Sequence, residues 1–258
     1  MTPKILREIV ATTHRSLASS PPDRRRLERL VENQPPAHDA LAILRKAGRH
    51  IIAEVKRKSP SAGTIHGTVN PVTQAQHYAS AGASAISVLT DSPYFGGSLT
   101  DLEAVSRAVS QPTLRKDFIV DEIQLLEARA YGASLVLLIA AILSDAELVA
   151  LRRASDRLGL TALVETHTQN EVKRAVNSGA TLIGVNSRDL NSFSVDLTVA
   201  ERLRPSIPAH IVAVAESGIE TSGDVVRLSQ AGYEVFLIGS CLMRASDPSA
   251  ALSVLLEA

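Results

Sequence analysis

Two lysines and two glutamates lie at the ends of short apolar segments, where acid–base chemistry would need them. Lys116 ends the segment 112–116, and Lys56 ends the segment 51–56. Only 6 of the 27 basic residues are lysines, so arginine is the ordinary surface cation of this chain. A partly buried lysine can release a proton, whereas arginine stays protonated. Together with Glu54 and Glu165, these lysines indicate proton transfer; ion pairs that hold the rim of a sheet are the alternative.

The bulk composition excludes several classes of protein. Acidic and basic residues number 27 each, so no net field attracts nucleic acid or an anionic membrane. Cys241 is the only cysteine, which excludes an internal disulfide and a cysteine-based metal site, and the histidines lack metal-binding spacing. The first residues do not resemble a signal peptide, and no apolar run approaches the roughly 20 residues of a membrane span. We expect a cytoplasmic monomer without a metal, a nucleic-acid partner or a membrane partner.

Short apolar segments alternate with amphipathic segments from about residue 50 onward. The apolar segments are rich in Val, Ile and Leu, a pattern typical of parallel strands that are covered on both faces. Glycine follows several amphipathic segments, as expected where a helix ends and a strand begins. The predicted strands are His50–Lys56, Ala85–Leu89, Thr113–Lys116, Leu135–Ile139, Thr161–Glu165, Leu182–Asn186, Ile211–Glu216 and Val235–Gly239.

Eight strands in 258 residues predict a closed (βα)8 TIM barrel of the α/β class, which typically has about 250 residues. An open, doubly wound sheet is the alternative, but the chain has no G-x-G-x-x-G turn. We expect one domain, in which residues 49–258 form the barrel and residues 1–48 add helices that cap it. These helices are predicted to begin at Thr2-Pro3, with proline at the first helical position, and to include Leu27–Glu32 and Ala40–Lys46.

Polar residues collect at the C-terminal strand ends, the face where parallel barrels place their chemistry. Besides the lysines and glutamates above, Asn186 ends the sixth strand and Glu216 ends the seventh. Buried charges are costly, so these groups must pair or shift their pKa values. Small residues follow the last two strands, and their backbone N–H groups can approach an anion closely. This pattern predicts a phosphate site at Ser217, Gly218, Gly239 and Ser240.

Loops after the early strands add candidates for ligand contact. Ser59 lies in a turn-rich loop that is long enough to fold over the mouth of the barrel. Phe95 and Phe118 lie near the same rim; both could line an apolar slot for a planar ring, and ordinary core packing explains each of them equally well. His167, two residues after Glu165, is interpreted as a solvent-facing residue at the start of a helix.

With these residues, the chain resembles the indole-3-glycerol-phosphate synthase family. The similarity spans about residues 48–245, and the combination of segments makes it specific. Residues 12–46 show no strong match. The matching segments are Glu54–Lys56, Ser59–Ser61, Ser87–Thr90, Tyr94–Ser98, Leu114–Asp121, Val136–Leu143, Leu163–Glu165, Ile183–Leu190, Val214–Ile219 and Leu237–Arg244.

The resemblance implies a carboxy-lyase of tryptophan biosynthesis that uses no cofactor. Its substrate would be 1-(2-carboxyphenylamino)-1-deoxyribulose 5-phosphate, an anthranilate joined to a phosphosugar. The ring carbon that bears the carboxylate joins the ketone carbon, and carbon dioxide and water then leave. The product would be indole-3-glycerol phosphate.

The resemblance also implies a role for each site residue. Lys116 would be the general acid of ring closure, Glu165 the acid or base of dehydration, and Lys56 the group that positions the anionic substrate. Glu216 would support the site from behind the residues that touch substrate. The implied catalytic set is Glu54, Lys56, Lys116, Glu165, Asn186 and Ser217. The implied substrate-binding set is Ser59, Phe95, Phe118, Leu137, Arg188, Leu190 and Glu216, and the implied phosphate-binding set is Gly218, Gly239 and Ser240.

This interpretation depends mainly on Lys116. In an apolar mouth near Phe118, its pKa is expected to fall toward neutrality, which would suit an acid worth about 100- to 10,000-fold in rate. Two alternatives are a Schiff-base aldolase barrel, in which Lys116 is the nucleophile, and a non-catalytic barrel that binds phosphosugars. A binding barrel would not need both Lys116 and Glu165.

Overall fold

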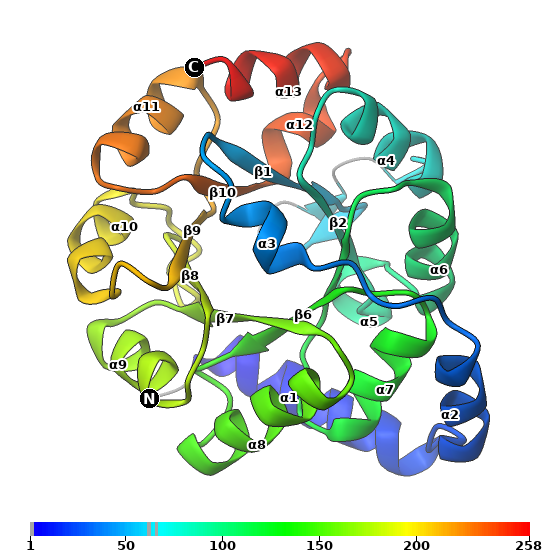
Figure 1. Cartoon of the computed structure of the whole chain (residues 1–258). Coiled ribbons are helices and arrows are strands. Elements are labelled where there is room, and N and C mark those ends of the chain that lie inside the picture. The colour runs from blue at the N-terminus through cyan, green and yellow to red at the C-terminus, as the bar shows by residue number, and fades with distance from the viewer. Residues whose placement is uncertain (1–2, 61–62, 65–66) are drawn as a thin grey trace.

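Eight parallel strands form a closed barrel with helices around its outside (Figure 1). The computed structural model describes residues 3–60, 63–64 and 67–258. The order around the ring is β1-β10-β9-β8-β7-β6-β5-β4, and β4 pairs with β1. The barrel strands are β1 (His50–Val55), β4 (Ala85–Leu89), β5 (Thr113–Lys116), β6 (Leu135–Ile139), β7 (Thr161–Thr166), β8 (Leu182–Asn186), β9 (Val212–Glu216) and β10 (Val235–Ile238).

The eight predicted strands are confirmed, and each predicted boundary lies within one residue of the observed one. Parallel strands buried on both faces have continuous apolar sequences, so the first and last residue of each strand can be located in the sequence. β6, with the sequence Leu-Val-Leu-Leu-Ile, is buried at every position. The predicted fold class, a (βα)8 barrel, is therefore correct.

Helices connect the strands and cover the outside of the barrel. The loop after β1 also holds a short hairpin of β2 (Lys58–Ser59) and β3 (Gly63–Thr64), which the sequence did not predict. The helices are α4 (Pro71–Ser80), α5 (Ser92–Phe95), α6 (Leu99–Ala108), α7 (Glu122–Ala130), α8 (Asp145–Arg157), α9 (Gln169–Asn177), α10 (Thr198–Leu203), α11 (Ser222–Gln230), α12 (Ser240–Arg244) and α13 (Pro248–Leu256), with a 3-10 turn at Arg204–Ser206.

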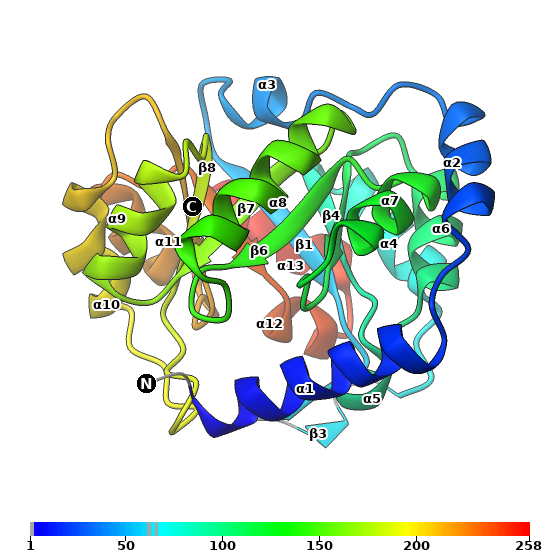
Figure 2. The ribbon, with the colours of Figure 1, turned by 90° about the horizontal axis from the view of Figure 1, so that it is seen from below.

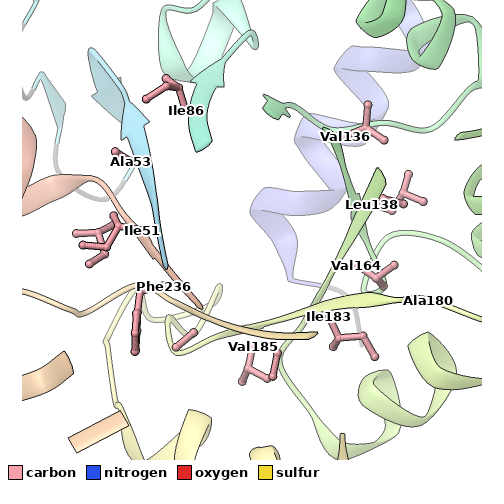
Figure 3. Close-up of a cluster of buried hydrophobic side chains, with 14 of the residues drawn as sticks. Ile51, Ala53, Ile86, Val136, Leu138, Val164, Ala180, Ile183, Val185 and Phe236 are labelled. Atoms are coloured by element: carbon pink, nitrogen blue, oxygen red, sulfur yellow. The ribbon is translucent and has the colours of Figure 1, made fainter. Parts of the chain in front are cut away.

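Along each strand, side chains point alternately toward the surrounding helices and toward the barrel interior. Ile51 and Ala53 belong to the cluster between strands and helices, and Figure 3 shows such side chains on the outer side of the strands. Ile52 belongs instead to the inner cluster, with Leu114 and Leu163 of other strands. A polar residue two positions after an inner apolar residue therefore points into the barrel mouth.

Three helices precede β1, as the sequence predicted. They are α1 (Lys4–Ser19), α2 (Arg24–Glu32) and α3 (Ala40–Leu44). Pro3 precedes α1 rather than occupying its first turn, so that part of the prediction is wrong, and Thr2 lies outside the described residues. Figure 2 shows α3 and α1 at opposite ends of the barrel. Leu44 and Ile9 both join the inner core cluster, so these helices cap the two ends of the barrel.

Candidate active site

The C-terminal strand ends surround a cavity of about 870 Å³. Every residue that the sequence placed in the candidate site lines this cavity, although these residues come from six barrel strands and from segments that follow the strands, including those after β4 and β10. The inward-facing positions of the strands and the closed barrel together bring them to one place. The structure thus assembles the full predicted set of side chains.

Lys116 occupies the centre of the polar part of this cavity. Its Nζ lies 3.0 Å from Oε2 of Glu216 and 3.3 Å from Oε2 of Glu165. The lysine side chain is 13% exposed, and the two glutamates are 1% and 5% exposed, so all three groups are largely withdrawn from water. One ammonium group is therefore shared between two buried carboxyl groups.

A second pair lies on β1 and just after it. Lys56 Nζ donates to Oε1 of Glu54 at a distance of 2.5 Å. Burial alone would raise the pKa of Glu54, but the ammonium groups of Lys56 and Lys116 outweigh burial and lower it. Glu54 is therefore an ionised carboxylate at neutral pH, and it holds Lys56 in place.

Glu165 is also held in its ionised form. Burial opposes ionisation, but Lys116, His167 and a hydrogen bond from Asn186 together lower the pKa of Glu165. Asn186 is also tied to the next loop, because its Oδ1 accepts a hydrogen bond from the backbone N–H of Arg188 at 2.9 Å. Glu165 therefore enters the cavity as a proton acceptor.

Glu216 differs from the other two carboxyl groups. Burial and the charge of Glu165 outweigh the attraction of Lys116 and raise the pKa of Glu216 to about 7. Near neutral pH it is therefore partly protonated. Glu216 was expected to support the site from behind, but it lines the cavity and bonds directly to Lys116.

Gly184 makes room for this contact. Glu216 on β9 reaches Lys116 on β5, and its carboxyl group crosses the inner face of β8. A Cβ atom on Gly184 would lie 1.9 Å from Oε1 of Glu216 and 3.0 Å from its Cδ. No side chain other than hydrogen fits at residue 184 while Glu216 keeps this position.

The expected fall in the pKa of Lys116 is wrong. Burial alone would lower this pKa, but the carboxyl groups of Glu216, Glu165 and Glu54 outweigh burial and raise it above the ordinary value. The three glutamates come from three strands, so the sequence around Lys116 did not reveal them. Lys116 is fully protonated in the structure.

The expected solvent-facing position of His167 is also wrong. Its side chain is 14% exposed and lies between two acidic residues, with Nε2 3.6 Å from Oε1 of Glu165 and Nδ1 3.3 Å from Oε2 of Glu171. The signal in the sequence was its spacing, since a residue two positions after the inward-facing Glu165 points the same way.

The predicted phosphate positions lie together in the mouth. Ser217 and Gly218 have consecutive left-handed backbones, with φ of 66° and 80°. Serine adopts this conformation at a cost, which is typical of functional sites. Gly239 and Ser240 follow β10, and α12 begins at Ser240. Tight backbone turns and helix starts can present N–H groups to an anion.

Apolar side chains form another part of the cavity wall. The Phe95 and Phe118 rings lie 6.0 Å apart with a 39° tilt, and Leu137 and Leu190 also line the cavity. α1 adds Ile5, Leu6 and Ile9, which were not among the predicted site residues. α1 is joined to α5 by a hydrogen bond of 3.2 Å between Thr12 Oγ1 and Tyr94 Oη.

Two kinds of feature are absent from the described residues. Within them, no group of three or more His, Cys, Asp or Glu side chains has an arrangement that could hold a metal ion. No described helix is long and apolar enough to cross a membrane.

Sequence comparisons point to one family. A family model described as indole-3-glycerol phosphate synthase matches residues 6–255. The chain is 48% identical over 232 residues to the indole-3-glycerol phosphate synthase of Streptomyces griseus, covering 90% of this chain and 86% of that protein. It is 46% identical over 224 residues to the enzyme of the same name from Mycobacterium avium, covering 87% and 82%.

Comparisons with solved structures show the fold alone. The chain is similar to 3-hexulose-6-phosphate synthase, with a TM-score of 0.61, 18% identity, and coverage of 81% of this chain and 98% of that one. It is also similar to KGPDC from Streptococcus mutans, with a TM-score of 0.63, 11% identity, and coverage of 81% and 96%. The fold, the cavity and the sequence relatives agree: the chain belongs to the indole-3-glycerol phosphate synthase family, the carboxy-lyases of tryptophan biosynthesis.

Proposed function

We propose that Lys116, Glu165 and Lys56 transfer the protons that convert 1-(2-carboxyphenylamino)-1-deoxyribulose 5-phosphate to indole-3-glycerol phosphate. One observation carries this proposal: Lys116 Nζ lies within 3.3 Å of two buried carboxyl groups in the cavity. Such an ammonium group is fixed in place and is fully loaded with a proton before substrate arrives.

Lys116 acts in ring closure. The ring carbon that bears the carboxylate attacks the ketone carbon, a C–C bond forms, and the C=O electron pair moves onto oxygen. The resulting alkoxide takes a proton from Lys116 Nζ and becomes a hydroxyl group. The raised pKa of Lys116 does not prevent this step, because an alkoxide is a stronger base than an amine. Glu216, 3.0 Å away and partly protonated, can return a proton to the lysine.

Decarboxylation and dehydration follow. Ring closure leaves a cationic ring, so the C–C bond to the carboxylate breaks and its electrons restore the ring. In dehydration the new hydroxyl group leaves as water with a proton from Lys56, and Glu165 accepts a proton from the intermediate. Glu165 suits this role because its lowered pKa keeps it ionised. Glu54 holds Lys56, and Asn186 orients Glu165.

The remaining predicted residues seat the substrate. Ser217, Gly218, Gly239 and Ser240 form the part of the cavity that suits the phosphate. We assign the aromatic ring of the substrate to the apolar wall of the same cavity. Ser59 and Arg188 supply polar contacts, Arg188 being suited to the carboxylate, and the apolar wall consists of Phe95, Phe118, Leu137 and Leu190.

The Schiff-base alternative fits the site poorly. A lysine that attacks a carbonyl carbon must first lose its proton, and the three carboxyl groups around Lys116 favour its charged form. No observation favours a barrel that binds phosphosugars without turnover.

Three further expectations stay predictions. We propose that the whole chain is one domain, because residues 1–48 supply α1 and therefore part of the cavity wall. We also propose that it works as a cytoplasmic monomer. Light scattering on the purified protein tests the monomer: a mass near 27.5 kDa agrees with it, and a mass of twice that value contradicts it.

Indole emission tests the proposed function directly. The chain contains no tryptophan, so the protein adds little background fluorescence. Wild type mixed with the carboxyphenylamino-deoxyribulose phosphate should produce growing indole emission. Lys116→Ala should reduce kcat about 100-fold or more. Lys173→Ala, at an exposed lysine on α9, is the matched control and should behave as wild type. Saturable binding without emission would favour a binding barrel, and equal activity of Lys116→Ala would refute the assigned acid.

A further inference from the structure

His167 is a largely buried, titratable group beside the reacting carboxylates that the mechanism above leaves unused. It follows β7 directly, and its side chain is 14% exposed. The ring lies between Glu165, which belongs to the proposed machinery, and Glu171 on α9, which does not line the cavity. We therefore considered what the imidazole of His167 contributes at this position.

Glu171 fixes the imidazole through two contacts. Glu171 Oε2 accepts a hydrogen bond from the backbone N–H of His167 at 2.8 Å and lies 3.3 Å from Nδ1 of the same residue. The backbone N–H of Glu171 in turn donates to Oγ1 of Thr168, the residue that caps α9. An ionised carboxylate only accepts hydrogen bonds, so Nδ1 carries a proton.

The other ring nitrogen faces Glu165. Nε2 is buried, has no hydrogen-bond partner within the described part of the chain, and lies 3.6 Å from Oε1 of Glu165. In a neutral ring, Nε2 would direct a lone pair toward a carboxylate. In an imidazolium, it directs an N–H toward the carboxylate, which is favourable. The geometry therefore favours the charged ring.

The charges around the ring agree with this protonation state. Acidic groups face it from four elements: Glu165 on β7, Glu171 on α9, Glu216 on β9, and Asp189 in the loop after β8. Lys116 on β5 is the cation at the other oxygen of Glu165. Burial lowers the pKa of His167, but the bond to Glu171 and the charges of Glu165, Glu171 and Glu216 outweigh burial and raise it.

We propose that His167 is a positioning residue: held by Glu171, its imidazolium lies against Oε1 of Glu165 and keeps that carboxylate ionised. Lys116 occupies Oε2 of the same carboxylate, so Glu165 is held by a cation on each side. No bond to His167 forms or breaks in the reaction. The inference rests on the proposed role of Glu165 as the group that accepts a proton.

The pH dependence of kcat/KM tests this inference. In His167→Gln, Glu165 loses a neighbouring cation, so its pKa rises and it becomes protonated at a higher pH. We expect kcat/KM about tenfold below wild type at the acidic end of the profile and nearly equal to wild type at the alkaline end. The phosphate of the substrate titrates alike with every variant and cancels in the ratio.

Two further variants separate positioning from packing. Glu171→Gln should lose activity at the acidic end in the same direction but less strongly, because without Glu171 the imidazole stays beside Glu165 but is only partly protonated in this pH range. The double variant should match His167→Gln, since Glu171 acts only through the histidine. His77→Gln, at an exposed histidine on α4, is the control and should leave the profile unchanged.

Several outcomes would overturn the inference. An equal loss at every pH in His167→Gln would indicate packing alone. Additive losses in the double variant would show that Glu171 acts independently of the histidine. If His167→Gln does not fold, NMR titration of the His167 ring in wild type and in Glu171→Gln replaces it. An ordinary histidine pKa in wild type that Glu171→Gln leaves unchanged would refute the charged ring. Failure of the proposed function is distinguishable, since wild type would then form no indole, or Glu165→Gln would form it at the wild-type rate.

Discussion

Gly184→Ala should disable the site without removing any side chain that touches substrate. The new Cβ would lie 1.9 Å from Oε1 of Glu216, and real atoms cannot approach so closely. Glu216 must turn away, which breaks its 3.0 Å contact with Lys116. The proposed acid then loses the group that returns its proton.

The size of the effect follows from two costs. Forcing an extra methyl group into a packed interior costs about 1–3 kcal/mol, and losing one hydrogen bond to a charged group costs about 1.5–3 kcal/mol. Together they predict a loss of about 2.5–6 kcal/mol, which lowers the melting temperature by roughly 5–24 °C for a chain of this size. We expect kcat to fall about 100-fold, since one proton-transfer partner is displaced.

A double-mutant cycle measures whether Glu216 is the cause. In the Glu216→Ala background, the carboxyl group that the new methyl group would meet is absent. Gly184→Ala should therefore lower the free energy of unfolding by about 2 kcal/mol less than it does in wild type. Gly223→Ala is the matched control: a methyl group on this helical glycine would meet only Thr221 Oγ1, at 3.5 Å, so the change should be neutral or slightly stabilising. Equal costs of Gly184→Ala in both backgrounds would refute the reasoning, as would wild-type kcat in the single variant.

Other predictions concern pH and the cap of the barrel. Burial raises the pKa of Glu216 from 4.5 to about 7. The neutral carboxyl group therefore increases the free energy of unfolding fully below pH 4.5, and this contribution is lost as the pH rises toward 7. Urea titrations should show that the free energy of unfolding of Glu216→Gln does not fall over this pH range. Ile9→Ala, which removes a buried contact of α1, should raise KM about tenfold and change kcat little, whereas unchanged KM would contradict a role of α1 in holding substrate. Tyr94→Phe, which removes the 3.2 Å bond to Thr12, should raise KM less than threefold.

The strands could be predicted from the sequence because burial on both faces leaves a simple signature. Leu135–Ile139 is apolar at every position, and the structure buries all five residues. Because side chains alternate between the two faces of a strand, the sequence also indicates which side chains point into the barrel. It therefore places Glu54, Lys116 and Glu165 at the mouth. The same rule applied to His167 would have corrected its predicted position.

Other properties depend on distances that no local pattern records. The direction of the pKa shift of Lys116 depends on Glu54, Glu165 and Glu216, which approach it from three strands. The importance of Gly184 depends on how far a side chain of the neighbouring strand extends. The apolar residues Leu6 and Ile9 of α1 have helical spacing, which indicates a packed helix face, but no local pattern shows that α1 closes the catalytic end of the barrel.

The central claim assigns Lys116 to ring closure and Glu165 to the later dehydration. Carbon dioxide leaves between these two steps, so a single-turnover experiment that records both carbon dioxide and indole separates the roles. Lys116→Ala should release neither product at a significant rate, because the ring does not close. Glu165→Gln should release carbon dioxide without a matching rise in indole emission. Release of carbon dioxide by Lys116→Ala, or equal rates of both products in Glu165→Gln, would contradict the account.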